Sequence, residues 1–263
     1  SGVGQAAVRA TASATADSPW VRINKAPATV TITNTAQTYD GAARPVTVTT
    51  VPAGLTVDVT YDGSGTVPTD VKGGGYAVVA TVNDANYEGT ANGTLTIAKA
   101  TATVTLSNTT HTYDGTAKSV TVTTVPAGLT VGVTYAGSGT APTAAGGYAV
   151  VATVNEANYQ GTANGTLTIQ KAVATVTLSN TTHTYDGTGK SVTVTTVPAD
   201  LTVDVVYGVA RTVLTPTNAG AYAVTATVNE TNYQGTANGT LTIQKAAATV
   251  TITNTAHTYD GSA

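Results

Sequence analysis

Three histidines lie in a repeated pattern and are the first candidates for acid–base chemistry. His111, His183 and His257 each stand two residues before the tyrosine of a Tyr-Asp-Gly sequence. Imidazole titrates near neutral pH, so a histidine beside a carboxylate has the chemistry of a general base. The equivalent residue in the first copy of the pattern is Gln37, whose amide cannot accept a proton in this pH range. We therefore assign no catalytic residue and predict that the protein is not an enzyme.

The aspartates of the pattern favour a turn over acid–base work. Each is followed by glycine, and a short carboxylate in that place accepts backbone N–H bonds within the turn. We therefore predict that the three-residue pattern is a structural repeat motif. Its members are Tyr39, Asp40, Gly41, Tyr113, Asp114, Gly115, Tyr185, Asp186, Gly187, Tyr259, Asp260 and Gly261.

Tyrosine rings offer a second chemistry, because aromatic faces can stack on sugars. Besides the Tyr-Asp-Gly rings, Tyr87, Tyr159 and Tyr233 follow asparagine in a recurring Asn-Tyr pair. The chain has no Phe and one Trp, so its 13 Tyr carry nearly all of the large side-chain area. A small domain needs such rings in its core. We predict buried rings with hydroxyls bonded to the backbone, as in the tyrosine corner of β-sandwiches, in preference to ligand-facing rings.

Acidic residues next to the Asn-Tyr pair differ between copies of the pattern. Asp84 and Glu88 flank the first pair, whereas Glu156 alone stands beside the second and Glu230 alone beside the third. Calcium needs several oxygen ligands, so the loss of one acid argues against a repeated calcium site. No metal and no cofactor are predicted.

Recurring lysines raise the question of a Lys-Asn isopeptide crosslink. Lys118 and Lys190 align with Arg44, which cannot form that bond, so this position is excluded. Lysines also recur where one copy meets the next, and we expect them to cap strand ends with the ammonium in solvent. These junction lysines are Lys25, Lys99, Lys171 and Lys245.

Composition excludes several classes of protein. The net charge of -3 does not provide the basic surface of a nucleic-acid binder, so no nucleic-acid partner is predicted. Cys is absent, which rules out a disulfide framework and a thiolate metal site. No apolar run is long enough to span a bilayer, so membrane insertion is not predicted.

The tyrosines reveal a tandem repeat. Equivalent rings lie 72 or 74 residues apart, as from Tyr39 to Tyr113 and from Tyr113 to Tyr185. A unit of this length is a small domain rather than a solenoid repeat. The predicted divisions are residues 1–26, the final strands of a preceding diverged repeat; 27–99, repeat 1; 100–171, repeat 2; 172–245, repeat 3; and 246–263, the first strand of a following repeat.

Alternating Thr and apolar residues predict strands in each repeat. In repeat 2, the stretches 102–106, 119–123 and 129–135 alternate with period two, which indicates half-buried strands. The stretch 148–154 is apolar in both phases, as an interior strand buried on two faces would be. Turns are expected at pairs such as Asn164-Gly165. We predict an all-β tandem array of small antiparallel immunoglobulin-like β-sandwiches, with β-grasp-like units as the alternative.

Three motifs recur in the same order in every repeat. They are Thr-Tyr-Asp-Gly, Asn-Tyr-x-Gly and Gly-Thr-Leu-Thr-Ile. In this order they resemble the MBG/YDG-type repeats of large bacterial surface proteins and, more loosely, bacterial immunoglobulin-like stalk domains. The resemblance covers about residues 27–245. It implies an extracellular adhesin-type stalk on a bacterium and no enzymatic activity.

The leading prediction is therefore structural: a rigid spacer in the stalk or filament-forming repeat region of a bacterial cell-surface protein. The alternative is an adhesin module that binds a glycan or a host surface protein through its loops. Repeat 3 is the best candidate for such binding, because its loop 208–216 replaces the Gly/Ser-rich stretch 137–142 of repeat 2.

The two termini support a hypothesis of self-association. Residues 246–263 of one copy would join residues 1–26 of the next copy, which gives a head-to-tail filament. This hypothesis holds if the chain is a processed, mature subunit. The competing expectation is that both ends are cut from a longer array.

Overall fold

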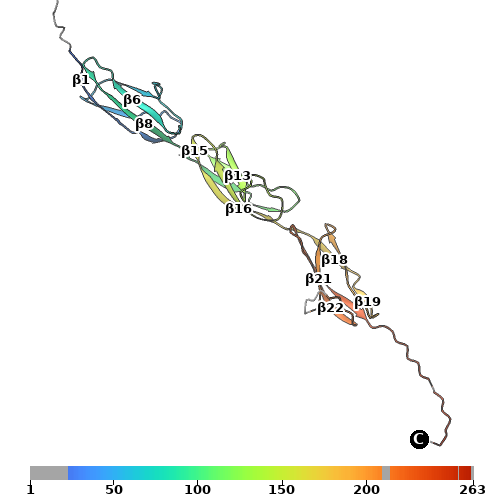
Figure 1. Ribbon diagram of the computed structural model, residues 1–263. Helices are drawn as coiled ribbons and strands as arrows, with labels where there is room; N and C mark the ends of the chain where they lie inside the picture. The colour runs from blue at the N-terminus through green and yellow to red at the C-terminus, as the bar shows by residue number, and fades with distance from the viewer. Residues whose placement is uncertain (1–22, 209–213, 254, 262–263) are drawn as a thin grey trace, which may run out of the picture. The chain divides into compact units, whose positions relative to one another are not determined.

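The computed structural model describes residues 23–208, 214–253 and 255–261, and within them every repeat is built from strands (Figure 1). Among the described residues, each repeat contains eight strands in the same order. The strands of repeat 1 are β1 (Ala26–Pro27), β2 (Thr29–Thr33), β3 (Ala36–Thr38), β4 (Thr47–Val51), β5 (Val57–Tyr61), β6 (Tyr76–Val82), β7 (Tyr87–Glu88) and β8 (Thr90–Ala98). Those of repeat 2 are β9 (Ala100–Thr101), β10 (Thr103–Ser107), β11 (Thr110–Thr112), β12 (Thr121–Val125), β13 (Val131–Tyr135), β14 (Gly146–Val154), β15 (Tyr159–Gln160) and β16 (Thr162–Gln170). Those of repeat 3 are β17 (Ala172–Val173), β18 (Thr175–Ser179), β19 (Thr182–Thr184), β20 (Thr193–Val197), β21 (Val203–Tyr207), β22 (Gly220–Val228), β23 (Tyr233–Gln234) and β24 (Thr236–Gln244).

Each repeat forms two main sheets, and the strands at the beginning of the repeat are divided between them. In repeat 2, β10 pairs antiparallel with β12, while β11, β16, β14 and β13 form a four-stranded sheet in that order. In this sheet β11 runs parallel to β16, and the other neighbours are antiparallel. Asn108 separates β10 from β11 at a φ of 54°, a left-handed conformation that asparagine tolerates. The chain thereby leaves one sheet and enters the other, and the equivalent strands pair in the same way in repeats 1 and 3.

A short parallel strand pair ties the beginning of each repeat to its Asn-Tyr pair. In repeat 3, β17 pairs with β23, and the amides of Ala172 and Ala174 donate hydrogen bonds to the carbonyls of Asn232 (2.9 Å) and Gln234 (2.8 Å). Gly235 lies so close to this strand that a Cβ on it would be 2.4 Å from the Ala174 oxygen. The glycine of Asn-Tyr-x-Gly is therefore required by a close approach of two backbones.

One face of the four-stranded sheet supplies most of the core. Val150 and Ala152 of β14 are 1% and 0% exposed, whereas the intervening Val151 is 38% exposed. The expectation that this strand is buried on both faces is therefore wrong. The strand is central in its sheet, but the partner layer of two strands covers only one face.

A tyrosine at the end of the sheet closes the core of each repeat. In repeat 2, the buried ring of Tyr135 packs with Val120, Val150, Leu167 and Ile169. Its hydroxyl accepts a hydrogen bond from the Val120 amide at 3.2 Å. The equivalent bonds run from the amides of Val46 and Val192 to the hydroxyls of Tyr61 and Tyr207. Each ring thus satisfies a core amide while it fills apolar space.

The pair Asn164-Gly165 does not form the predicted turn. Both residues lie inside β16, where Gly165 is aligned with Val150 of β14. A Cβ on Gly165 would be 2.9 Å from Leu106 Cδ1. The glycine therefore makes room for a large side chain of the facing sheet, and a strand continues where the dipeptide alone favours a hairpin.

The observed sheets confirm the predicted array of small β-sandwiches. The β-grasp alternative is wrong, because that fold packs a sheet around a helix and no described residue is helical. Of the stretch 1–26, residues 1–22 lie outside the described residues. The described part of 246–263 forms no strand, and Val250 and Ile252 are 85% and 79% exposed. The assignment of both ends to neighbouring repeats, and the division points at 27, 100, 172 and 246, stay predictions.

Candidate functional site

The Tyr-Asp-Gly turn holds its carboxylate in bonds within the repeat. In repeat 2, Asp114 Oδ1 accepts hydrogen bonds from the Thr116 amide at 2.9 Å and from Thr116 Oγ1 at 2.6 Å, and Oδ2 pairs with Lys118. Gly115 adopts a φ of 83°, which favours glycine. The hydrogen-bonded ion pair with Lys118, together with the bonds from Thr116, holds the pKa of the Asp114 carboxyl far below its usual value. The carboxylate stays ionised and fully engaged, which suits a structural role rather than proton transfer.

The other turns use the same arrangement with small changes. Asp186 bonds to Thr188 and pairs with Lys190. Asp40 accepts the Ala42 amide at 2.9 Å and pairs with Arg44 at 2.5 Å, so arginine replaces lysine in the ion pair. In the tail, Gly261 has the same positive φ of 84°, and Tyr259 beside it is 89% exposed.

The histidines bridge two loops by a single donor group. His111 Nε2 lies 3.0 Å from the Asn108 carbonyl and 3.1 Å from the Ser119 carbonyl. His183 has the same two contacts in repeat 3. In repeat 1, Gln37 Nε2 donates to the carbonyls of Asn34 and Pro45 at 2.9 and 2.8 Å. Two carbonyl acceptors require a protonated Nε2, and an amide N–H₂ meets the same need, which explains the exchange of His for Gln.

Three of the acids considered for calcium binding accept hydrogen bonds from nearby backbone amides. Asp84 Oδ1 accepts the amides of Asn86 and Tyr87, at 2.8 and 3.1 Å. Glu156 and Glu230 accept single amides from the preceding loop of their own repeats. Within the described ranges, no three His, Asp or Glu side chains form a group that could hold a metal ion.

Two junction lysines bond to the loop that contains the Asn-Tyr pair. Lys25 Nζ donates to the Asp84 carbonyl, and Lys171 Nζ donates to the Glu230 carbonyl, each at 2.6 Å. These two ammonium groups therefore cap a carbonyl in the loop between β6 and β7 or between β22 and β23, rather than a strand end.

The Tyr-Asp-Gly and Asn-Tyr tyrosines contact one another across successive repeats. The Tyr113 ring of repeat 2 meets the Tyr233 ring of repeat 3 edge to face, with centroids 5.4 Å apart and planes at 80°. Beside the rings, Asn232 Oδ1 accepts the Ala145 amide of repeat 2 at 2.9 Å. An edge-to-face pair of this kind adds about 0.5–1.5 kcal/mol beyond area burial. Repeat 3 is thus bonded to repeat 2 by two adjacent side chains of one loop.

The same contacts recur in the first of the two compact units into which the chain divides. That unit comprises repeat 1 with Ala157–Tyr159. Tyr39 and Tyr159 meet edge to face at 5.4 Å and 81°. Asn158 Oδ1 accepts the Val71 amide at 2.9 Å, and its Nδ2 donates to Asp70 Oδ1 at 2.9 Å.

Two groups form this contact between successive repeats. The Asn-Tyr loop is the pair Asn86–Tyr87, Asn158–Tyr159 or Asn232–Tyr233. The receptor is the Tyr-Asp-Gly ring with the backbone amide that the asparagine engages: Tyr39 with Val71, Tyr113 with Ala145, and at the equivalent positions of repeat 3, Tyr185 with Ala219.

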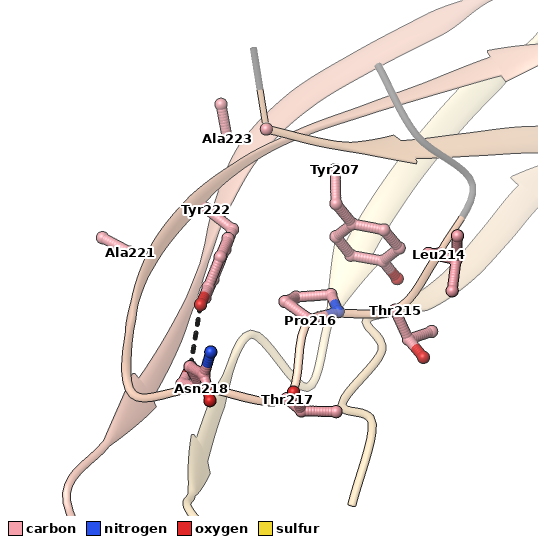
Figure 2. Close-up of a pocket in the computed structure, with 10 residues that line it drawn as sticks. Tyr207, Leu214, Thr215, Pro216, Thr217, Asn218, Ala221, Tyr222 and Ala223 are labelled. Atoms are coloured by element: carbon pink, nitrogen blue, oxygen red, sulfur yellow. Dashed lines mark hydrogen bonds between the residues drawn. The ribbon is translucent and has the colours of Figure 1, made fainter. Parts of the chain in front are cut away.

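A hollow of about 700 Å³ lies on repeat 3 beside the loop that distinguishes this repeat (Figure 2). Tyr207, Leu214, Pro216 and Tyr222 present apolar surface to it, and Leu214 is 78% exposed. None of the described residues that line it is an acid, a lysine, an arginine or a histidine. Residues 209–213 of the predicted binding loop lie outside the described residues. The described walls suit an uncharged ligand.

Comparison with protein families decides what these repeats are. The family described as the MBG domain matches residues 28–101, 102–173 and 174–247. The chain belongs to the MBG domain family. Its three tandem MBG repeats are a non-catalytic type of domain that occurs in extracellular surface proteins. No helix long and apolar enough to cross a membrane is found in the part of the chain that the structure describes.

Two solved structures that are similar to this chain are described as sets of four domains. One is described as Sidekick-1 immunoglobulin domains 1-4, with 14% identity over 83% of this chain and 76% of that chain, at a TM-score of 0.30. Another is Drosophila N-cadherin EC1-4, with 13% identity over 86% of this chain and 75% of that chain, at a TM-score of 0.28. A search of curated proteins found no match.

Two further tyrosines of the MBG repeat, which sequence reasoning did not single out, have hydroxyls bonded to the backbone. Such hydroxyls belong to Tyr135 and to Tyr148, which donates to the Ala144 carbonyl at 2.9 Å. The rings of Tyr39 and Tyr113 are half-buried, pack against the core cluster of their own repeat and also contact a tyrosine of the next repeat, whereas Tyr185 is exposed. One available signal was that Tyr135 ends an alternating strand in its apolar phase, whereas the Asn-Tyr pair follows a strand in a polar loop.

Proposed function

We propose that the chain is a stiff spacer in the stalk of a bacterial surface protein, where MBG repeats in series hold another part of that protein away from the cell. The observation that supports this most is the contact between the Asn-Tyr loop and the receptor. A ring pair and a side-chain-to-backbone hydrogen bond together resist both rotation and separation of neighbouring repeats.

Other features of the repeats agree with a spacer. Each repeat has a separate buried cluster, around Leu95, Leu167 or Leu241. Stability is then a sum over repeats and their contacts, as in other tandem arrays. Only 10% of the residues are charged, and the outward positions of β10, β12 and their equivalents are largely threonine. Threonine keeps a strand surface soluble without a charged patch that would attract other molecules.

Distance measurement between two spin labels tests this proposal. The chain has no Cys, so Thr123→Cys and Thr195→Cys, both at exposed strand positions, place one label on repeat 2 and one on repeat 3. Double electron–electron resonance should give a narrow distribution of distances between the two labels. The added pair Asn232→Ala and Tyr233→Ala should broaden it severalfold, because it removes the ring contact and the Ala145 bond.

The matched control is Asn86→Ala with Tyr87→Ala. This pair removes the equivalent loop of repeat 1 and leaves the contact between repeats 2 and 3 intact. A distribution that is already broad in the unaltered chain would contradict the spacer.

A second candidate function is a binding module, which the hollow of repeat 3 favours. An uncharged glycan is the chemistry that its apolar and hydroxyl-bearing walls suit. Replacement of residues 208–216 by the sequence of residues 137–142 should then abolish retention on a glycan array. Unchanged retention of the altered chain on the array, or no retention of the original chain, would exclude glycan binding at this hollow.

A further inference from the structure

The tyrosines of each repeat differ in what their hydroxyl groups do. In repeat 2, the Tyr135 hydroxyl accepts a hydrogen bond from the Val120 amide, and Tyr148 donates one to the Ala144 carbonyl. Equivalent bonds occur in the other repeats, at Tyr61, Tyr76, Tyr207 and Tyr222. The four tyrosines that meet in pairs across successive repeats are different, because none of their hydroxyls bonds to a described residue. They are Tyr39 with Tyr159, and Tyr113 with Tyr233.

Packing alone does not require a hydroxyl on these four rings. Tyr39 and Tyr113 pack against the core cluster of their own repeats, and each meets a tyrosine of the next repeat edge to face. A phenylalanine ring makes both kinds of contact. What the hydroxyl adds is the chemistry of a phenol, which loses an electron and a proton far more readily than an unsubstituted ring does. The ring pairs therefore have a reactivity that the spacer function does not use.

The composition of the chain directs oxidation towards tyrosine. Cys and Met, two side chains with well-known oxidation chemistry, are both absent. One Trp and 13 Tyr remain as the aromatic side chains that a one-electron oxidant attacks. The four paired rings are half-buried, so part of each is exposed to solvent. An oxidant in solution therefore reaches rings that already lie in pairs.

The two ring pairs have nearly the same geometry. Their centroids lie 5.4 Å apart in both pairs, and their planes meet at 81° and 80°. The asparagine before the second tyrosine fixes the loop, since Asn232 Oδ1 accepts the Ala145 amide at 2.9 Å and Asn158 makes the equivalent bond. A turn of one ring about its Cβ–Cγ bond, a torsion with broad energy minima, brings the carbons beside the two hydroxyls towards each other. Two radicals formed in one pair are thus already neighbours.

We propose that each of these contacts is a site of oxidative cross-linking, where the paired tyrosines couple as dityrosine. The bonds join Tyr39 to Tyr159 and Tyr113 to Tyr233. The oxidant is hydrogen peroxide acting through a haem peroxidase, which takes one electron and one proton from each phenol while the peroxide is reduced to two molecules of water. The two radicals form a C–C bond between ring carbons ortho to the hydroxyls. The hydrogen on each of these carbons then moves to the oxygen of its own ring, which restores both phenols.

Each such bond makes the contact between two repeats covalent. The linked tyrosines are 120 residues apart in both pairs, so each bond closes a long loop of the chain. A closed loop restricts the unfolded chain and persists when the repeats are pulled apart. This inference goes beyond the spacer function and rests on the ring pairs alone.

Treatment of the full chain with a haem peroxidase and hydrogen peroxide tests the proposal. At about 5 μM chain, coupling within one molecule should prevail, because groups tethered in one chain have an effective concentration of the order of mM. The monomeric product should show dityrosine fluorescence and a mass lower by two hydrogen atoms for each bond. Peptide mass spectrometry should assign the bonds to the two ring pairs. The denatured product should migrate faster than the untreated chain in a dodecyl sulfate gel, because its closed loops keep it compact.

Phenylalanine variants separate the proposed bonds from random oxidation. Tyr159→Phe with Tyr233→Phe keeps both ring contacts, so circular dichroism and melting temperature should be unchanged while monomeric dityrosine is lost. The matched control is Tyr87→Phe with Tyr185→Phe, which changes tyrosines at equivalent positions that belong to neither ring pair. Its yield of dityrosine should equal that of the original chain.

Three results would overturn the proposal. They are an undiminished yield of monomeric dityrosine in the variant Tyr159→Phe with Tyr233→Phe, bonds that map to other tyrosines, and an original chain that gives no dityrosine or couples only to separate chains. None of these results depends on how stiff the joints are, so the distance measurement between spin labels tests the spacer function separately.

Discussion

At the scale of single residues, the side chain at position 111 acts as a bridge between two loops. Its Nε2 lies within hydrogen-bonding distance of two carbonyls, and Gln37 makes both equivalent bonds in repeat 1. The requirement at this position is one donor group of the right reach, and the acid–base chemistry of imidazole is not used.

His111→Gln should therefore leave stability nearly unchanged, whereas His111→Ala should lower the free energy of unfolding by about 1 kcal/mol, because two carbonyls lose their donor. Denaturant titration measures both. His257→Ala is the control, since His257 is exposed in the tail and should show no effect. Equal losses for the Gln and Ala variants would contradict the bridging role.

Acid should weaken the Tyr-Asp-Gly turns. The pKa of Asp114 is lower in the folded chain than in the unfolded one, where it is about 3.9. The folded state therefore holds fewer protons, so the stabilisation is complete above the unfolded pKa and is lost as pH falls below it. The melting temperature should drop between about pH 5 and pH 2. The drop in melting temperature should be smaller in the double variant Asp114→Asn with Asp186→Asn than in the unaltered chain. Equal drops in the two proteins would show that these carboxylates do not cause the loss of stability in acid.

Residue types alone predict the turns but not the tyrosine partners. Aspartate before glycine has few alternatives to a turn, and Asp114 and Gly115 adopt it. A tyrosine has an apolar ring and a polar hydroxyl, so the same residue type fits a core, a ligand site or a contact between repeats. Which of these Tyr113 occupies depends on Tyr233, a residue of the next repeat, and no local pattern contains that information.

At the scale of strands, the alternation of threonine and apolar residues predicts the strand positions well, whereas the glycines do not predict the turns reliably. The stretches 103–107, 121–125 and 131–135 form strands close to where period-two alternation predicts them. Gly165 misleads because its reason is a contact with Leu106 in the other sheet. Local propensity at Asn164-Gly165 favours a hairpin, and packing between sheets overrides it.

Gly165→Ala should lower the free energy of unfolding by no more than about 1 kcal/mol, because its Cβ would lie 2.9 Å from Leu106 Cδ1, which is the end of a flexible side chain. The matched control is Gly132→Ala in β13, where the nearest atom to a new Cβ is a carbonyl oxygen at 3.9 Å. Chemical denaturation of both variants gives the comparison. Equal stability of the two variants would mean that Leu106 moves aside without cost.

At the scale of the whole molecule, each repeat has its own core, and repeats 1 and 2 are each contacted by the Asn-Tyr loop of the repeat that follows. A polypeptide of residues 100–171 should therefore fold alone with a cooperative melt. A polypeptide of residues 100–245 should unfold at higher denaturant, because coupling to repeat 3 adds roughly 1–2 kcal/mol.

Within the longer polypeptide, Tyr233→Ala should remove that coupling. Tyr159→Ala should leave it intact, because the receptor for Tyr159 is in repeat 1 and is not part of this polypeptide. The same denaturant midpoint for all of these polypeptides would show that the repeats unfold independently.

The contact between Asn-Tyr loop and receptor also imposes an order in time. The loops of repeats 2 and 3 dock on the repeats that precede them, so a ribosome releases each of these two receptors before the loop that closes it. An emerging repeat first folds around its own buried leucine and remains open at one end until its successor is nearly complete. Synthesis therefore closes these joints one by one from the N-terminus, and the newest repeat is always the unfinished one.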